Sequence, residues 1–118
     1  MKKATGIFIF WILFAACNKP STIEVVNNLP VAIVNNIKWG DVPIASELLP
    51  GKTSGKVKIY EDAHYNLDFP EEFPLKFYLK LNGDNMYLET RMSYKLRKED
   101  GILISIDDSL KVFNPVSE

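Results

Sequence analysis

The strongest constraint on the fold of this chain is an alternating pattern that predicts a β-hairpin. Apolar and polar side chains alternate in Leu75–Leu81 and again in Met86–Met92. A period of two is typical of half-buried strands, and the residues between them, Asn82–Asn85, favour a turn. A four-residue loop gives four pairs on one face: Leu81 with Met86, Leu79 with Leu88, Phe77 with Thr90, and Leu75 with Met92.

The second face of this hairpin is polar and carries two tyrosines. Tyr78 and Tyr87 are diagonal neighbours on it in the four-residue-loop register. Exposed aromatic side chains among charges can stack on sugar rings or contact protein partners, although tyrosine is also frequent in strands because of its β propensity. We take Tyr78 and Tyr87 as the candidate residues of a ligand or partner face. Their charged neighbours are Lys76, Lys80, Glu89 and Arg91.

The rest of the chain also predicts short strands. Seven or eight stretches are separated by turn signals about every 8–12 residues, a spacing typical of sandwiches and barrels. We predict an all-β fold, an antiparallel β-sandwich of immunoglobulin-like or transthyretin-like character, in residues 22–114. The likeness to immunoglobulin domains is architectural, because the chain has one cysteine and not a pair. Trp39 is expected to be the buried indole.

Several elements are expected upstream of the hairpin. The first are a strand at Thr22–Val26 and a strand at Val31–Val34 that continues at Ile37–Trp39 after a bend or bulge at Asn35-Asn36. A loop at Gly40–Pro43 follows. Ile44–Leu49 fits a strand or a single helical turn, but an irregular segment is favoured, and a type II turn is expected at Leu49–Lys52. Gly51 supplies the positive φ that a type II turn requires.

A second hairpin is expected between Lys56–Tyr60 and Tyr65–Phe69, which both alternate with period two. A three-residue loop pairs Ile59 with Leu67 and keeps apolar side chains on one face. A four-residue loop would set Ile59 against Asn66, so the first register is expected.

The remaining segments complete the predicted domain. Pro70–Pro74 is expected to be a stiff connection, because proline fixes φ. Ser93–Arg97 extends the main hairpin. Ile102–Ile106 is apolar on both faces, a pattern typical of a central strand. Leu110–Phe113 closes the domain, and residues 115–118 form a tail.

The first residues indicate an export signal. Lys2 and Lys3 precede Ile7–Ala16, a run without charged or polar side chains. The run is too short to span a membrane as a helix, which needs about 20 residues. A positive start, a short apolar run and small residues at its end are typical of a secretory signal peptide, here residues 1–16.

Phe14-Ala15-Ala16-Cys17 resembles the lipobox of bacterial lipoproteins and ends on the chain's single cysteine. The resemblance implies cleavage before Cys17 and attachment of diacylglycerol, and of a further acyl chain such as palmitate, to that residue. The sequence departs from the family at Phe14, where a smaller aliphatic residue is preferred. Two or three acyl chains anchor a protein stably, whereas one does so only marginally. The alternatives are an ordinary signal peptide with a chance cysteine or an uncleaved anchor.

Residues 17–21 are expected to form the lipid-modified cysteine and a short polar tether. The residue after the cysteine is Asn18 and not an aspartate. By resemblance to lipoprotein sorting in Gram-negative bacteria, this implies the outer membrane, facing the periplasm. The chain has 14 Lys and Arg against 15 Asp and Glu without a basic run, so we expect no nucleic-acid partner.

No residue pattern indicates a reaction. His64 is the only histidine and lies near Asp62 in an expected turn, without a nucleophile motif. Acidic pairs and Asp84 lack the alternate-residue spacing of a calcium loop and fit solvated turns. We therefore expect a protein that is not an enzyme, with no catalytic residue, no metal site and no cofactor.

The whole plan resembles small β-sandwich lipoproteins of Gram-negative bacteria, a group without assigned chemistry. The shared features are the lipobox, the short tether, the asparagine-interrupted strand before Trp39, the turn at Leu49-Pro50-Gly51, and the closing strand after Asp107-Asp108. Our first hypothesis is a non-enzymatic interaction or structural domain that is membrane-anchored in the cell envelope and binds another envelope protein through a sheet face or edge. The alternative is a glycan-binding accessory module that uses Tyr78 and Tyr87.

Overall fold

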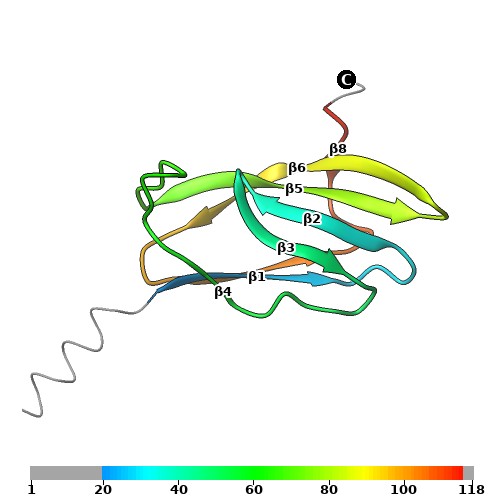
Figure 1. The fold of residues 1–118 in the computed structure, drawn as a ribbon, viewed down its shortest axis with the longest axis horizontal. Helices are drawn as coiled ribbons and strands as arrows, with labels where there is room; N and C mark the ends of the chain where they lie inside the picture. Colours follow the sequence, from blue (N-terminus) through cyan, green and yellow to red (C-terminus); the bar gives the residue numbers. More distant parts are fainter. Residues whose placement is uncertain (1–19, 116–118) are drawn as a thin grey trace, which may run out of the picture.

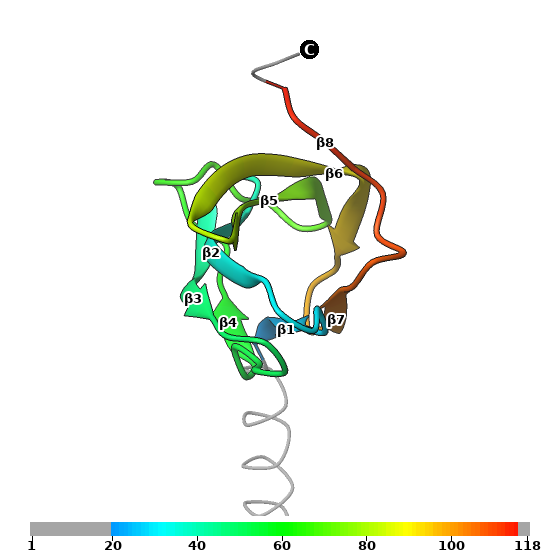
Figure 2. The same ribbon diagram turned by 90° about the vertical axis from the view of Figure 1, so that its right-hand side faces the viewer.

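In residues 20–115, which the computed structural model describes, the chain folds into two facing β-sheets and contains no helix. The three-stranded sheet has the order β4-β1-β7, and the five-stranded sheet has the order β3-β2-β5-β6-β8. Figure 1 shows one sheet above the other, and Figure 2 shows the same layers end-on. The predicted all-β sandwich is confirmed. The strands are β1 (Ser21–Asn27), β2 (Ile33–Trp39), β3 (Val42–Leu48), β4 (Val57–Ile59), β5 (Glu71–Leu81), β6 (Asp84–Leu96), β7 (Gly101–Ile106) and β8 (Val112–Phe113).

This part of the chain accordingly has no helix that is long and apolar enough to span a membrane.

β1 is the central strand of the three-stranded sheet. Alternate side chains of β1 point into the molecule, and Ile23 and Val25 are completely buried. β4 pairs with β1 in antiparallel orientation, but β7 pairs with it in parallel, with Ile23 opposite Ile102. The prediction of a wholly antiparallel sandwich is therefore wrong for this pair. Parallel neighbours need a crossover connection, and here the chain returns to β1 from the opposite sheet through residues 97–100.

β7 lies at the edge of its sheet, so the prediction of a central strand at Ile102–Ile106 is wrong. Ile104 and Ile106 are each 2% exposed, whereas Leu103 is 65% exposed. The continuous apolar pattern therefore does not mean burial on both faces. Within the described residues, β7 has a partner strand on one side only.

β5 and β6 form the predicted main hairpin with a tighter loop. Leu81 lies opposite Asp84, so the loop is Asn82-Gly83 and not the predicted four residues. Both loop residues have positive φ, 53° at Asn82 and 82° at Gly83, which a two-residue hairpin turn of the Asn-Gly type requires. Between Lys76 and Leu81 the register differs from the prediction by two residues, and it shifts back between Pro74 and Lys76, so that Pro74 lies opposite Ser93. Because side chains alternate with period two, each one stays on its predicted face.

β2 shows the predicted interruption. Its register against β5 shifts between Asn35 and Lys38, and Asn36 has a φ of 50°. Asparagine tolerates this left-handed conformation better than most residues, so the bulge is encoded locally.

β3 extends over Val42–Leu48. The loop expected at Gly40–Pro43 therefore ends early, and at Ile44–Leu49 the structure has the strand alternative and not the favoured irregular segment. Val42 and Ile44 are each only 8% exposed and belong to the core. Burial of both side chains favours a strand paired with β2 over an irregular conformation.

The turn after β3 has its predicted form. Gly51 has a φ of 80°, and the Lys52 amide donates to the Leu49 carbonyl at 3.0 Å. The chain then enters β4, which pairs with β1 and sets Ile59 opposite Ser21.

The predicted hairpin between Lys56–Tyr60 and Tyr65–Phe69 is wrong. Residues 65–69 form no strand, because a tight turn places the Leu67 amide 2.9 Å from the Asp62 carbonyl and buries the Leu67 side chain in the core. The connection predicted at Pro70–Pro74 ends early, since β5 begins at Glu71 after a cis Phe69–Pro70 peptide bond.

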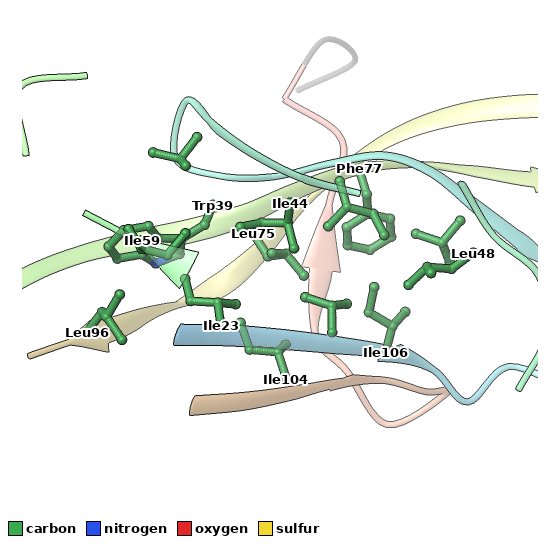
Figure 3. Packing of buried hydrophobic residues seen from close by; sticks show 14 of the residues in the cluster. Ile23, Trp39, Ile44, Leu48, Ile59, Leu75, Phe77, Leu96, Ile104 and Ile106 are labelled. Atoms are coloured by element: carbon green, nitrogen blue, oxygen red, sulfur yellow. The ribbon is translucent and has the colours of Figure 1, made fainter. Parts of the chain in front are cut away.

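The core lies between the two sheets. Figure 3 shows Leu75 and Phe77 of the five-stranded sheet directed toward Ile23 and Ile104 of the other. Trp39 is completely buried, as predicted for the indole. Full burial of a large apolar side chain contributes about 1.5–3 kcal/mol, so this layer is the main source of stability for a domain without disulfides.

Candidate functional site

The two candidate tyrosines meet on the outer face of the five-stranded sheet. Tyr78 of β5 and Tyr87 of β6 are directly opposite each other, and not diagonal as predicted, because the hairpin loop is two residues shorter. Their ring centroids are 5.2 Å apart with the ring planes tilted by 52°. This separation lies within the range of favourable aromatic pairs. Tyr78 is 36% exposed, so part of its ring is accessible to a ligand.

A hollow of about 540 Å³ lies beside the two rings and brings together β2, β5 and β6. We call it the tyrosine hollow. The β2 bulge at Asn36 and the turn after Trp39 place polar side chains around it. The residues that line it are Asn36, Lys38, Asp41, Lys76, Tyr78 and Tyr87.

Charge is arranged unevenly around the tyrosine hollow. Lys38 and Lys76 are directly opposite on β2 and β5, a like-charge arrangement that destabilises a sheet. The Asp41 Oδ1 atom lies 3.6 Å from Lys76 Nζ, and the Asp41 side chain is 91% exposed. A surface pair of this kind contributes at most about 1 kcal/mol. The hollow thus presents ammonium donors, a carboxylate acceptor and aromatic rings within one small area.

Tyr87 is held in place by its own strand. Its hydroxyl donates to Glu89 Oε1 at 3.1 Å. Burial, together with the hydrogen bond to Glu89 and the charge of that carboxylate, raises the pKa of Tyr87 to about 12. The phenol is therefore neutral across the ordinary pH range, and its ring is a fixed wall of the hollow.

The other residues singled out in the sequence are not brought into this site. His64 lies exposed in the turn after β4, where its amide donates to Asp62 Oδ1 at 2.7 Å and its ring contacts Tyr65 edge-on at 4.8 Å. Asp84 lies exposed at the hairpin tip. Cys17 and the signal-peptide residues lie outside the described part of the chain. Within residues 20–115, no group of three or more His, Cys, Asp and Glu side chains is placed to hold a metal ion.

Sequence reasoning missed half of the tyrosine hollow. Asn36, Lys38 and Asp41 come from β2 and the following turn, and nothing local relates them to the main hairpin. Only the antiparallel pairing of β2 with β5 brings them beside Tyr78. The bulge signal at Asn35-Asn36 was the one available indication that a side chain there is redirected.

Comparison of the chain with protein-family models, with curated proteins and with solved structures finds no match.

Proposed function

We propose that this protein is a membrane-anchored lipoprotein whose β-sandwich acts as a non-enzymatic interaction domain in the bacterial cell envelope. The observation that carries the proposal is the position of Cys17. It ends a lipobox-like sequence and lies four residues before Ser21, where β1 begins. A fully extended chain covers about 3.3–3.6 Å per residue, so acyl chains on Cys17 hold this end of the sandwich close to the membrane surface.

The proposed location is the outer membrane, with the domain facing the periplasm. Asn18 directly after the cysteine supports it, as does the absence of an acidic run behind it. The domain carries a mixed surface charge without a basic run, which fits contact with proteins or glycans better than contact with nucleic acid.

Metabolic labelling with an alkyne fatty acid tests the anchor. The full chain should incorporate the probe and fractionate with the outer membrane, whereas Cys17→Ser should lose the label. Asn18→Asp is the matched control for location, since it keeps the cysteine and should stay labelled while it moves to the inner membrane. Unlabelled wild-type protein contradicts the anchor.

A second candidate function is glycan binding at the tyrosine hollow. It is supported by the partly exposed ring of Tyr78, by its contact with Tyr87, and by donors and acceptors that surround both rings. Sugar recognition combines stacking on an aromatic ring with hydrogen bonds from polar side chains. A glycan array probed with the soluble domain should then give specific binding that Tyr78→Ala removes. Tyr60→Ala is the control, because Tyr60 is 62% exposed and does not line the hollow. Binding that both variants retain, or no binding at all, rejects this candidate.

A further inference from the structure

The four sheet edges of the sandwich are protected unequally. β3 carries Pro43 and Glu47, β4 is three residues long and carries Lys58, and β8 is two residues long and follows Lys111. Proline, lysine and shortness are the devices by which proteins prevent strands from adding to an edge. β7, Gly101–Ile106, has none of them, since its sequence GILISI contains no charge and no proline.

The backbone of β7 offers hydrogen bonds along its outer side. The Asn28 amide donates to the Ile106 carbonyl at 2.8 Å, so the even-numbered residues of β7 direct their backbone groups toward β1. Backbone groups alternate in direction along a strand. Those of Leu103 and Ser105 therefore point away from β1, to a side on which no strand of the described chain pairs with β7.

A hollow of about 360 Å³ lies beside this edge, between β7 and the second half of β6. We call it the edge hollow. Met92 and Leu103 contribute to it and are 59% and 65% exposed. β6 is paired with β8 at Glu89 and Thr90, and the Arg91 amide donates to the Lys111 carbonyl at 2.9 Å. The residues of β6 that border the edge hollow are Met92 and Tyr94. In Figure 2 the β7–β8 connection runs along the same side of the sandwich, from β7 up to β8 beside β6. The lining residues are Met92, Tyr94, Leu103, Ile104, Ser105, Asp107, Ser109, Leu110 and Lys111.

We propose that the β7 edge and the edge hollow bind an extended segment of another envelope protein, which adds to β7 as a strand and places an apolar side chain into the hollow. The proposal rests on the proposed function, because it specifies how the anchored domain meets a protein partner. In strand addition the backbone hydrogen bonds provide affinity, and the pockets for alternate side chains provide specificity.

A single extended segment fits these features better than a second copy of the domain. A second copy presents its own β7 already joined to β1, with the β7–β8 connection alongside. It can therefore meet this edge only as a folded sheet, side by side. An extended segment satisfies both the backbone groups of Leu103 and Ser105 and the apolar lining.

Site-specific crosslinking in living cells tests the proposal. A photoreactive amino acid replaces Met92 in the full chain, in cells that naturally make the protein, and mass spectrometry identifies the crosslinked peptide. We expect a segment of a different protein with alternating apolar residues. A synthetic copy of that segment should slow amide hydrogen exchange at Leu103 and Ser105.

Two substitutions and a control sharpen the test. Leu103→Pro removes an outward amide without breaking the β1 ladder, a placement that edge strands tolerate, and should reduce the crosslink by about tenfold or more. Leu103→Lys keeps every backbone group and adds a charge to the edge. It should also reduce the crosslink, and it replaces the proline variant in the test if that variant does not fold. Val31→Lys is the control, since Val31 is 70% exposed in the β1–β2 turn, and should leave the crosslink unchanged.

Each outcome decides the proposal. Crosslinks to a second copy alone, to lipid alone or to nothing overturn it, as does a crosslink that both Leu103 variants retain. Fatty-acid labelling in the same cells separates this result from failure of the anchor. Labelled protein without a partner adduct at Met92 rejects the edge site, whereas unlabelled protein rejects the lipoprotein.

Discussion

The indole Nε1 of Trp39 donates to the Tyr94 carbonyl at 3.0 Å, and this hydrogen bond joins β2 to β6 across β5, the strand that lies between them. The Trp39 ring also contacts Phe73 edge-on, with the ring centroids 4.9 Å apart. One completely buried side chain thus connects three strands of the five-stranded sheet.

Trp39→Phe should lower the free energy of unfolding of the domain by about 1–3 kcal/mol, because it leaves the Tyr94 carbonyl without its partner and opens a cavity. The measurement is urea denaturation followed by circular dichroism. Tyr60→Phe, a change at an exposed ring, is the control and should be neutral. A Trp39→Phe variant as stable as the wild type contradicts this role.

Gly40 and Gly51 both have positive φ, 60° and 80°, but only Gly40 is crowded. A Cβ atom on Gly40 would lie 2.7 Å from Cγ of Phe73, whereas a Cβ on Gly51 would meet nothing within 4 Å. Both alanine variants strain the backbone, and Gly40→Ala also overpacks the core. We expect Gly40→Ala to cost about 1–3 kcal/mol more than Gly51→Ala. Equal denaturation midpoints for the two variants would show that Phe73 is not where the structure places it.

The pKa of Tyr87 gives a prediction at alkaline pH. Burial and Glu89 raise that pKa to about 12 from an ordinary value of 10.0. A raised pKa means that folding favours the neutral phenol, so this contribution to stability is complete below pH 10.0 and is lost as the pH rises toward 12. The stability difference between wild type and Tyr87→Phe should therefore shrink over this interval.

Spectroscopic titration provides the check. Burial and the charge of Asp107 also raise the pKa of Tyr94. The ultraviolet absorbance of tyrosinate should therefore show late titration by both Tyr87 and Tyr94, and Tyr87→Phe should remove one of the two late-titrating groups. Glu89→Gln should lower the pKa of Tyr87 without returning it fully to its ordinary value, since burial is the larger cause. A titration curve that is identical with and without Tyr87 argues against the raised pKa.

Lys38 and Lys76 lie directly opposite on one face of the sheet. Lys38→Gln should stabilise the domain by about 0.2–1 kcal/mol by removing the repulsion, and the gain should be smaller at high salt because the charges are screened. Lys80→Gln is the matched control, because Lys80 is paired with Ile33 and not with a cation. A loss of stability in Lys38→Gln would instead assign Lys38 a stabilising contact.

The sequence predicted those features that depend on local patterns. Alternation assigned the faces of β5 and β6 correctly, and the asparagine pair located the β2 bulge. The hairpin register was wrong by two residues, since both registers keep the same face apolar and only the preference of Asn82-Gly83 for a two-residue turn separates them.

Pairings between distant segments were beyond local reasoning. The sequence predicts that β4 pairs with Tyr65–Phe69, the next segment along the chain, but in the structure β4 pairs with β1. β7 was expected to be central because Leu103 is apolar, yet burial depends on which strands flank it. For the same reason the sequence predicted the tyrosines of the tyrosine hollow but not its other side. Lys38 and Asp41 lie beside Tyr78 only because β2 pairs with β5.

The most direct test of the lipoprotein proposal is the mass of the amino-terminal tryptic peptide of the protein purified from membranes. Trypsin does not cleave between Lys19 and Pro20, so the proposal predicts a peptide that begins at Cys17 and ends at Lys38. This peptide should carry the added mass of a diacylglycerol group, with or without an amide-linked acyl chain. A peptide that retains residues before Cys17, or one that begins at an unmodified Cys17, would contradict it.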